Sequence, residues 1–221
     1  KHDAVEKEGK TTLDYLLYNY IRGMMSSMLN SRLSEKAQDA DCPYLMGYAY
    51  DGNYLLSKNK DAFNLVYVPK EGMTEQATQY IVTEAMRAME HGFTETEYIR
   101  AREEYLSGLE SQYNERNKVD NDIYGRAYCS HYLDNEPIPS IEQKYQIMNQ
   151  IVPMIPVEAI NSMLPEIITT DGKNMIVVSF NQDKEGAVYP TPDAMKAAVD
   201  AGLNAKVEAY VDNVKQEPLI A

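Results

Sequence analysis

Tryptophan is absent from this 221-residue sequence, and cysteine and histidine are scarce, with two and three residues respectively. Cys42 and Cys129 are too few for a disulfide framework, and without nearby histidines they cannot supply the four ligands of a structural zinc site. We therefore expect two free, half-buried thiols. None of His2, His91 and His131 has a second histidine three or four residues away, and neither H-E-x-x-H nor H-x-x-E-H occurs. The sequence thus predicts no metal bound by this chain.

Other features that the sequence lacks argue against further classes of protein. No apolar run approaches the roughly 18 residues of a membrane span, and the first ten residues contain no hydrophobic signal region. The formal net charge of −13 argues against binding to nucleic acid or to an anionic membrane. Neither a phosphate-binding glycine loop nor a G-x-S-x-G elbow occurs. The chain opens without an initiating Met, so we expect a fragment or a processed product.

Two of the histidines, His91 and His131, lie in predicted helices, where a functional role can be weighed. His91 lies at the predicted end of a helix, where an imidazole interacts well with the helix dipole and the exposed carbonyls, so a capping role is expected. Cys129 and His131 are two residues apart and would point in different directions on a helix, which disfavours a catalytic pair. The 34 acidic residues are spread along the chain, and no carboxylate pair stands out. By its residues alone, the chain is typical of a non-catalytic domain.

The most prominent feature of the sequence is an apolar stripe in the segment Leu13–Lys36. In this segment Leu, Met, Tyr and Ile recur at spacings of three and four, which predicts a helix of about six turns. Such a stripe is far more often core than a ligand site. We expect the elements downstream to cover it.

Two aromatic and β-branched segments follow, Tyr44–Tyr50 and Ala62–Val68. Their composition predicts strands, and Asp51-Gly52-Asn53 predicts a turn between them, with Ser57–Asp61 as a second, solvated turn. We expect an antiparallel hairpin or meander whose second strand ends at Pro69.

Most of the remaining chain has helical signals. A helix is expected from Thr74 to a left-handed glycine cap at Gly92, and Thr94 with Glu97 predicts a capping box. The other predicted helices, all inferred from caps, periodicity and proline positions, run to about 118 after that box and over 121–133, 140–151, 157–164 and 191–202. A turn at Asp171-Gly172 should precede a strand at Met175–Phe180.

This order predicts an α+β fold, in which helices pack on one face of a small, mostly antiparallel sheet. We assign residues 1–204 to one domain and 205–221 to a linker toward a following domain, because Gln216-Glu217-Pro218 is typical of a linker.

Several short motifs occur in a fixed order along the chain. Ser31-Arg32-Leu33 ends a long helix, a strand with Ala49-Tyr50 follows, then Gly92-Phe93-Thr94 with Glu97, and then Ala101-Arg102. This order resembles the second domain of the pitrilysin or insulinase family of zinc metallopeptidases. The similarity extends over about residues 13–202. The opening strand of that domain is not found ahead of the long helix, which fits a fragment that begins just inside a domain border.

The resemblance implies a substrate-enclosing domain that lies in one half of a clamshell around a peptide. Zinc is expected in the preceding domain of a parent protein, in the bacterial periplasm or cell envelope. No residue here matches the zinc ligands of that family, so this chain alone is expected to be inactive. Its expected partners are the other domains of the same polypeptide and a peptide substrate.

In some relatives, an edge strand of this domain captures the end of the peptide by β-augmentation. The corresponding segment here supplies five candidate contacts: Gly47, Tyr48, Tyr50, Gly52 and Tyr54. The alternative is that these tyrosines pack on the helices. Two other functions stay open, namely a stand-alone interaction or assembly protein with the same fold, and an unrelated enzyme that uses Cys129.

Overall fold

The computed structural model describes residues 1–168 and 173–212 of the chain. Its α-helices are α1 (Leu13–Lys36), α2 (Thr74–His91), α3 (Glu95–Asn114), α4 (Asn121–Asp134), α5 (Ile141–Ile151), α6 (Val157–Ile167) and α7 (Pro192–Leu203). Its strands are β1 (His2–Asp3), β2 (Tyr44–Asn53) and β3 (Lys60–Pro69). Short 3₁₀ turns lie at η1 (Lys7–Gly9), η2 (Arg116–Lys118) and η3 (Val152–Met154).

The predicted long helix is confirmed as α1. Its first turn is capped by Thr12, whose hydroxyl accepts a hydrogen bond from the Tyr15 amide. The stripe is buried from its second turn onward, at residues that include Tyr20, Met24, Met28, Leu29 and Leu33. The first turn is different, because Leu13 is exposed. Helix α1 packs against β2, α2, α3 and α6, so the other elements do cover this stripe.

The predicted hairpin is also confirmed, but its turn is not where the sequence placed it. Strands β2 and β3 pair antiparallel with Gly52 opposite Ala62, so Asp51-Gly52-Asn53 lies within β2. The chain turns at residues 54–59, where Leu55 adopts a positive φ of 52°. This turn overlaps the second predicted turn, Ser57–Asp61. The first predicted turn is absent, because the cross-strand ladder extends beyond the aromatic segments. Pro69 ends β3 as expected.

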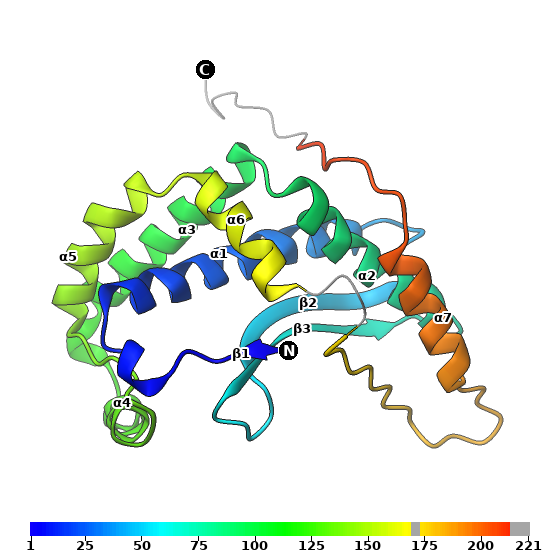
Figure 1. The fold of residues 1–221 in the computed structure, drawn as a ribbon, viewed down its shortest axis with the longest axis horizontal. Coiled ribbons are helices and arrows are strands. Elements are labelled where there is room, and N and C mark those ends of the chain that lie inside the picture. Colours follow the sequence, from blue (N-terminus) through cyan, green and yellow to red (C-terminus); the bar gives the residue numbers. More distant parts are fainter. Residues whose placement is uncertain (169–172, 213–221) are drawn as a thin grey trace.

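The elements form two layers. In Figure 1 the sheet, with strand order β1-β3-β2, lies below α1, α2, α3 and α6, while α4 lies at the lower left and α7 at the lower right. The hydrophobic core lies between the helices and the sheet, where side chains such as Tyr44, Ile81 and Tyr98 are fully buried. The predicted α+β fold is confirmed.

The strand predicted at Met175–Phe180 is wrong. These residues have no regular secondary structure and join no strand among the described residues, and Ile176, Val178 and Phe180 are exposed. A β-forming composition does not specify a strand by itself. In the described part of the chain β1 pairs only with Lys60 and Asp61, so the rest of that edge of β3 is open, but Met175–Phe180 form no ladder with it. The predicted turn at Asp171-Gly172 lies outside the described residues.

Two helix ends differ from the prediction. Helix α3 ends at Asn114, because Glu115 leaves helical backbone angles and only a 3₁₀ turn follows before residue 119. Helix α6 continues through Pro165 to Ile167, because Ile167 lies on the same buried face as Ile160 and Leu164. The capping box at the start of α3 is where the sequence predicted it, and α5 and α7 begin within one residue of their predicted starts.

Two of the motifs that carry the family resemblance meet at the corner between α2 and α3. Arg32 lies on α1, and its Nε and Nη2 donate to both carboxylate oxygens of Glu97, at 2.7 and 2.9 Å. Arg32 Nη2 also donates to the Gly92 carbonyl at 3.0 Å. Asn161 of α6 holds the same corner through the amide and carbonyl of Phe93, at 2.8 and 3.0 Å. These motif residues therefore join helices to one another.

Gly92 differs from the predicted left-handed cap in one angle. Its φ of 73° is positive, but its ψ of −168° places it outside the left-handed helical region. Its amide still donates to the Ala88 carbonyl at 2.8 Å. A Cβ at this position would lie 2.6 Å from Asn161 Nδ2, so only glycine lets Asn161 approach the corner.

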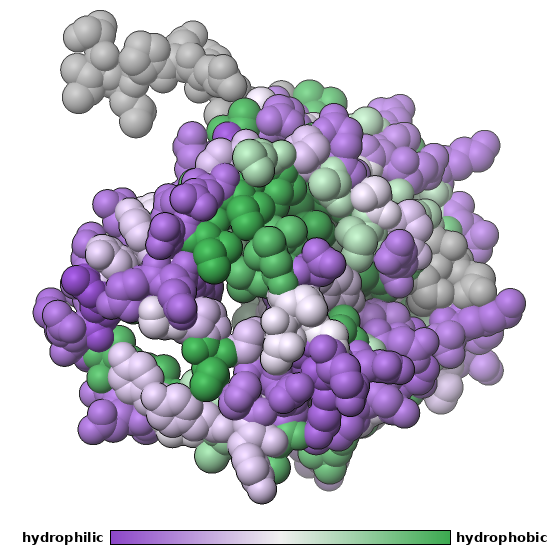
Figure 2. Space-filling view, turned by 60° about the vertical axis from the view of Figure 1, so that its left-hand side comes forward, coloured by the Kyte–Doolittle hydropathy of each residue, from purple (hydrophilic) through white to green (hydrophobic). Residues whose placement is uncertain are grey.

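The surface is mostly polar. Figure 2, in which the left-hand side of Figure 1 comes forward, shows hydrophilic residues over most of this face and one hollowed apolar area in its upper middle. Helix α4 has no buried residue, and it exposes three aromatic rings, at Tyr124, Tyr128 and Tyr132. No helix in the described part of the chain combines the length and the apolar character needed to cross a membrane.

Candidate functional site

Strand β2 forms one edge of the sheet, as the peptide-capture hypothesis requires. Its ladder with β3 is fixed by the pairing of Gly47 with Tyr67 and by the hydrogen bond from the Tyr54 amide to the Lys60 carbonyl at 3.0 Å. In an antiparallel ladder, hydrogen-bonded and non-hydrogen-bonded pairs alternate. Even-numbered residues of β2 therefore bond to β3, and the backbone groups of Gly47, Ala49 and Asp51 point away from it.

Helix α1 covers the middle of this edge. Asn30 donates from Nδ2 to the Ala49 carbonyl at 3.0 Å, and its Oδ1 accepts from the Ala49 amide at 2.6 Å. This side chain takes the place of one residue of an added strand. Outward-pointing backbone groups remain on either side, at Gly47 and Asp51.

The predicted tyrosines lie in different surroundings. Tyr48 and Tyr50 project from the face of the sheet opposite the helices, with 39% and 45% of their surface exposed and with stacked rings 6.1 Å apart. For these two residues, packing on the helices is not observed. Tyr54 is half-buried at the start of the turn, where the Lys1 ammonium lies 5.0 Å from its ring centre.

The two predicted glycines also differ. A Cβ at Gly47 would lie 3.0 Å from Ile81 Cδ1 and 3.4 Å from the Tyr44 ring, so this position has a packing reason for glycine. A Cβ at Gly52 would meet only the Tyr50 ring, at 4.0 Å. The space around Gly52 therefore does not require glycine.

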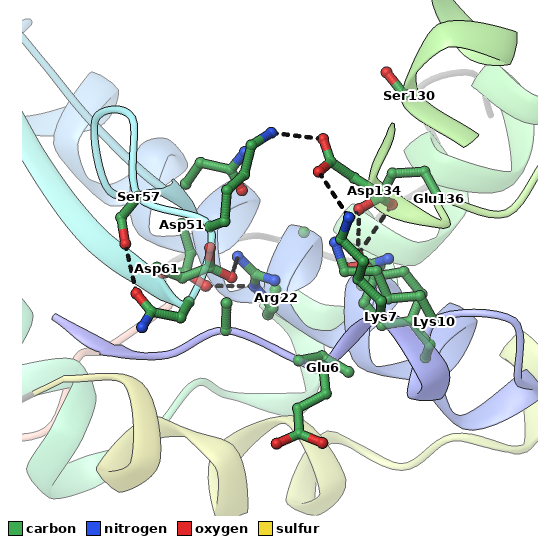
Figure 3. A pocket seen from close by; sticks show the side chains of 18 of the residues that line it. Glu6, Lys7, Lys10, Arg22, Asp51, Ser57, Asp61, Ser130, Asp134 and Glu136 are labelled. Carbon is green, nitrogen blue, oxygen red and sulfur yellow. Dashed lines mark hydrogen bonds and ion pairs between the residues drawn. The ribbon is translucent and has the colours of Figure 1, made fainter. Parts of the chain in front are cut away.

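A polar cavity of about 860 Å³ opens beside the end of β2. Figure 3 shows that its walls come from the N-terminal segment, α1, the two strands and the end of α4. Tyr50, Asp51 and Asn53 line it, so the end of β2 borders the cavity.

Arg22, Asp51 and Asp61 line one side of this cavity, and His2 pairs with Asp51. Arg22 of α1 contacts Asp51 through Nε and lies 3.2 Å from Asp61 through Nη2. His2 Nε2 lies 2.8 Å from Asp51 Oδ1, and His2 Nδ1 lies 3.1 Å from the Asp3 carbonyl. The side chains of Arg22, Asp51 and Asp61 are nearly inaccessible to solvent.

The geometry favours the protonated form of His2. A carboxylate and a carbonyl can only accept hydrogen bonds, so both ring nitrogens of His2 must donate. The hydrogen bond to Asp51 raises the pKa of His2, despite the opposing effect of burial. With His2 protonated, its charge and that of Arg22 balance those of Asp51 and Asp61.

The opposite wall is held by ion pairs to α4 and the residues after it. Lys58 from the turn between the strands lies 2.7 Å from Asp134, and Lys10 lies 2.6 Å from Glu136. The Tyr15 hydroxyl also lies 3.0 and 3.1 Å from the two carboxylate oxygens of Glu136. These contacts hold α4 beside the hairpin and so define the cavity.

Sequence reasoning did not find this cluster. Arg22 lies within the long apolar helix, and a buried charge inside such a helix is a signal that a partner must be near. Its partners Asp51 and Asp61 are distant in sequence, and both had been predicted to lie in turns. The sequence analysis considered His2 only as a metal ligand, and it gave no sign of the contact with Asp51.

The remaining sequence candidates have structural partners. His91 Nε2 donates to the carbonyl of Val207 at 2.9 Å, so it binds the segment after α7 and not the carbonyls of its own helix. His131 Nδ1 donates to the Glu136 carbonyl at 2.8 Å. Both cysteines are free, as predicted, but Cys42 is buried and Cys129 exposed, so neither is half-buried. Within residues 1–168 and 173–212, no group of three or more His, Cys, Asp or Glu side chains could hold a metal ion.

Comparison with solved structures identifies the fold. The periplasmic protease PqqL from Escherichia coli superposes with a TM-score of 0.71 over 94% of this chain and 23% of its own, at 20% sequence identity. The chain has the fold of part of PqqL. A structure of the first half of PqqL matches with a TM-score of 0.69, over 96% of this chain and 44% of that one, at 16% identity.

A sequence comparison agrees with the PqqL match. A protein from Arabidopsis thaliana described as "Zinc protease PQQL-like" is 28% identical over 131 residues, which is 59% of this chain and 12% of that protein. No protein-family model matches the chain. The predicted resemblance to a domain of a zinc protease is confirmed, and the chain spans about an eighth of the length of its curated relative.

Proposed function

We propose that this chain is a non-catalytic domain that encloses the substrate of a larger zinc metalloendopeptidase. The observation that carries this proposal is a PqqL-like fold over nearly the whole chain, in a sequence that contains no H-x-x-E-H motif. Zinc and the residues that activate water would belong to another domain of the same polypeptide. Because PqqL is described as periplasmic, we place the parent protein in the bacterial periplasm or cell envelope.

We further propose that the edge of β2 captures one end of the peptide. Backbone groups at Gly47 and Asp51 would pair with an added strand, and such pairing supplies affinity without demanding a particular sequence. Tyr48 and Tyr50 would contact side chains of that strand, while Gly52 and Tyr54 continue the surface toward the turn. Ala49 becomes available to the peptide only when Asn30 moves away.

The cavity beside β2 offers room for the end of such a peptide. Asp61 lines it, and Asp61 Oδ1 is buried without a hydrogen-bond partner among the described residues. A peptide ammonium group would satisfy this oxygen. The proposal therefore favours capture of the amino-terminal end.

Replacing Gly47 by Pro in the full-length polypeptide tests this proposal. Proline removes the outward N–H, so KM should rise more for long peptides, which reach β2, than for short ones. Gly47→Ala is the matched control, because it crowds Ile81 in a similar way but keeps the N–H. Equal effects on long and short peptides, or equal effects of the two variants, would exclude capture by this edge.

A stand-alone interaction protein is the second candidate, and the exposed aromatic rings of α4 favour it. The two proposals differ in the reading frame upstream of Lys1. An H-x-x-E-H motif within about one domain length supports the peptidase, whereas an unrelated domain or a stop codon supports the interaction protein.

A further inference from the structure

The segment after α7, residues 205–212, lies against the α2–α3 corner and is called the strap below. In Figure 1 it leaves α7 at the right and runs upward past α2. Two side chains of α2 hold its backbone: Arg87 donates to the Glu208 carbonyl at 2.5 Å, and His91 donates to the Val207 carbonyl at 2.9 Å. The predicted linker is thus attached to the domain over its first residues.

Tyr210 is the aromatic anchor of the strap. Its ring centre lies 4.4 Å from the Arg32 guanidinium carbon, which also lies 4.8 Å from the ring centre of Phe93. The Tyr210 hydroxyl donates to Glu35 at the end of α1. Tyr210 therefore lies over the buried Arg32–Glu97 pair and helps to separate it from water.

Asp212 is the acidic anchor. Its carboxylate accepts from Arg100 Nη1 at 2.7 Å and from the Thr96 hydroxyl, and only 7% of its side chain is exposed. The intervening Val211 is 71% exposed. This alternation is that of an extended segment that presents every second side chain to the surface beneath it.

We propose that the corner formed by the ends of α1 and α2 and the start of α3 is a docking site for extended segments with a Tyr-x-Asp pattern, and that the strap is its intramolecular occupant. The stacked Arg32 selects the aromatic ring, and Arg100 with Thr96 selects the carboxylate two residues later. Docking fixes the direction in which the polypeptide leaves the domain. This inference does not depend on the proposed peptidase function.

The absence of tryptophan from the chain provides a clean reporter of docking. Val211→Trp introduces a single indole at an exposed position between the two anchors. Adding Asp212→Asn or Tyr210→Ala to this variant should lower the tryptophan anisotropy and increase its quenching by acrylamide, because the strap is released. Asp200→Asn is the matched control, since it removes an exposed carboxylate of α7 that pairs with Lys196.

A second experiment tests whether the corner binds the strap sequence when it is supplied as a separate peptide. A labelled peptide with the sequence of residues 206–212 is titrated into the Tyr210→Ala, Asp212→Asn chain, whose own strap is weakened. Saturable binding is expected, with loss of binding for a peptide that carries Ala at both anchor positions, and about tenfold weaker binding when Arg100→Ala is added. The proposal would be overturned if Asp212→Asn and Tyr210→Ala left the tryptophan anisotropy unchanged. It would also be overturned if the peptide with Ala at both anchor positions bound as tightly as the parent peptide. Far-UV circular dichroism of each variant checks that the domain remains folded.

Discussion

At the residue scale, the motifs that reveal the family resemblance have structural roles. Arg32 belongs to one motif and Gly92, Phe93 and Glu97 to another, and the structure joins them through buried hydrogen bonds. Arg32 on α1 thus contacts a corner that lies 60 residues later in the chain. The resemblance therefore identifies a fold and does not locate a reaction.

Removal of the Arg32 side chain should lower the stability of the domain. Arg32→Ala leaves the charge of Glu97 buried without its cationic partner, and breaking a buried ion pair typically lowers the free energy of unfolding by about 3–5 kcal/mol. Arg126→Ala is the control, because its pair with Asp122 is exposed and should contribute about 0–1 kcal/mol. Urea unfolding followed by circular dichroism measures both, and equal values for the two variants would contradict a structural role for Arg32.

His2 should make stability depend on pH. Its pKa in the folded chain is raised above the ordinary value of 6.5, so the folded state holds the proton more tightly than the unfolded state. Its contribution is therefore fully present below about pH 6.5 and is lost as the pH rises through the raised pKa. Urea midpoints between pH 5.5 and 8.5, as a rough range around this pKa, should fall more steeply for the parent chain than for His2→Asn. Parallel curves would show that His2 and Asp51 are not coupled.

At the element scale, helix starts were predictable and the sheet was less so. Capping boxes and the spacing of apolar residues are local, and the boundaries of α1 follow from them. The extent of β2 depends on its partner, because Asp51 to Asn53 become strand only through pairing with residues 61–63 of β3. Met175–Phe180 shows the converse case, in which a strand-forming sequence has no described partner.

Alanine substitution at two glycines, Gly92 and Gly108, should change the stability of the domain in opposite directions. Gly92→Ala places a methyl group 2.6 Å from Asn161 at a positive φ, and we expect destabilisation. Gly108 lies within α3, and a Cβ added there would meet nothing within 4 Å, so Gly108→Ala should stabilise the helix by about 0.5–1 kcal/mol. Thermal unfolding compares the two variants. Tolerance of Gly92→Ala would mean that Asn161 does not hold the corner as the structure shows.

At the scale of the whole molecule, the stability of this domain should not depend on zinc. Chelation with EDTA should leave the unfolding temperature of the chain unchanged, while the proposed full-length peptidase should lose activity in the same buffer. The two measurements are made side by side, and zinc is then added back. A fall in the unfolding temperature that zinc reverses would contradict the proposal that the metal belongs to another domain.

The sequence by itself determined the helices, the hairpin and the fold class, because caps, apolar periodicity and β-branched runs act over a few residues. Only the tertiary structure decided which residues share a site. It placed Asn30 on the edge of β2, it assembled His2, Arg22, Asp51 and Asp61 beside the cavity, and it attached the strap to the α2–α3 corner. These contacts join residues about 20 to more than 100 positions apart, and their partners are chosen by packing and by the pairing of buried charges.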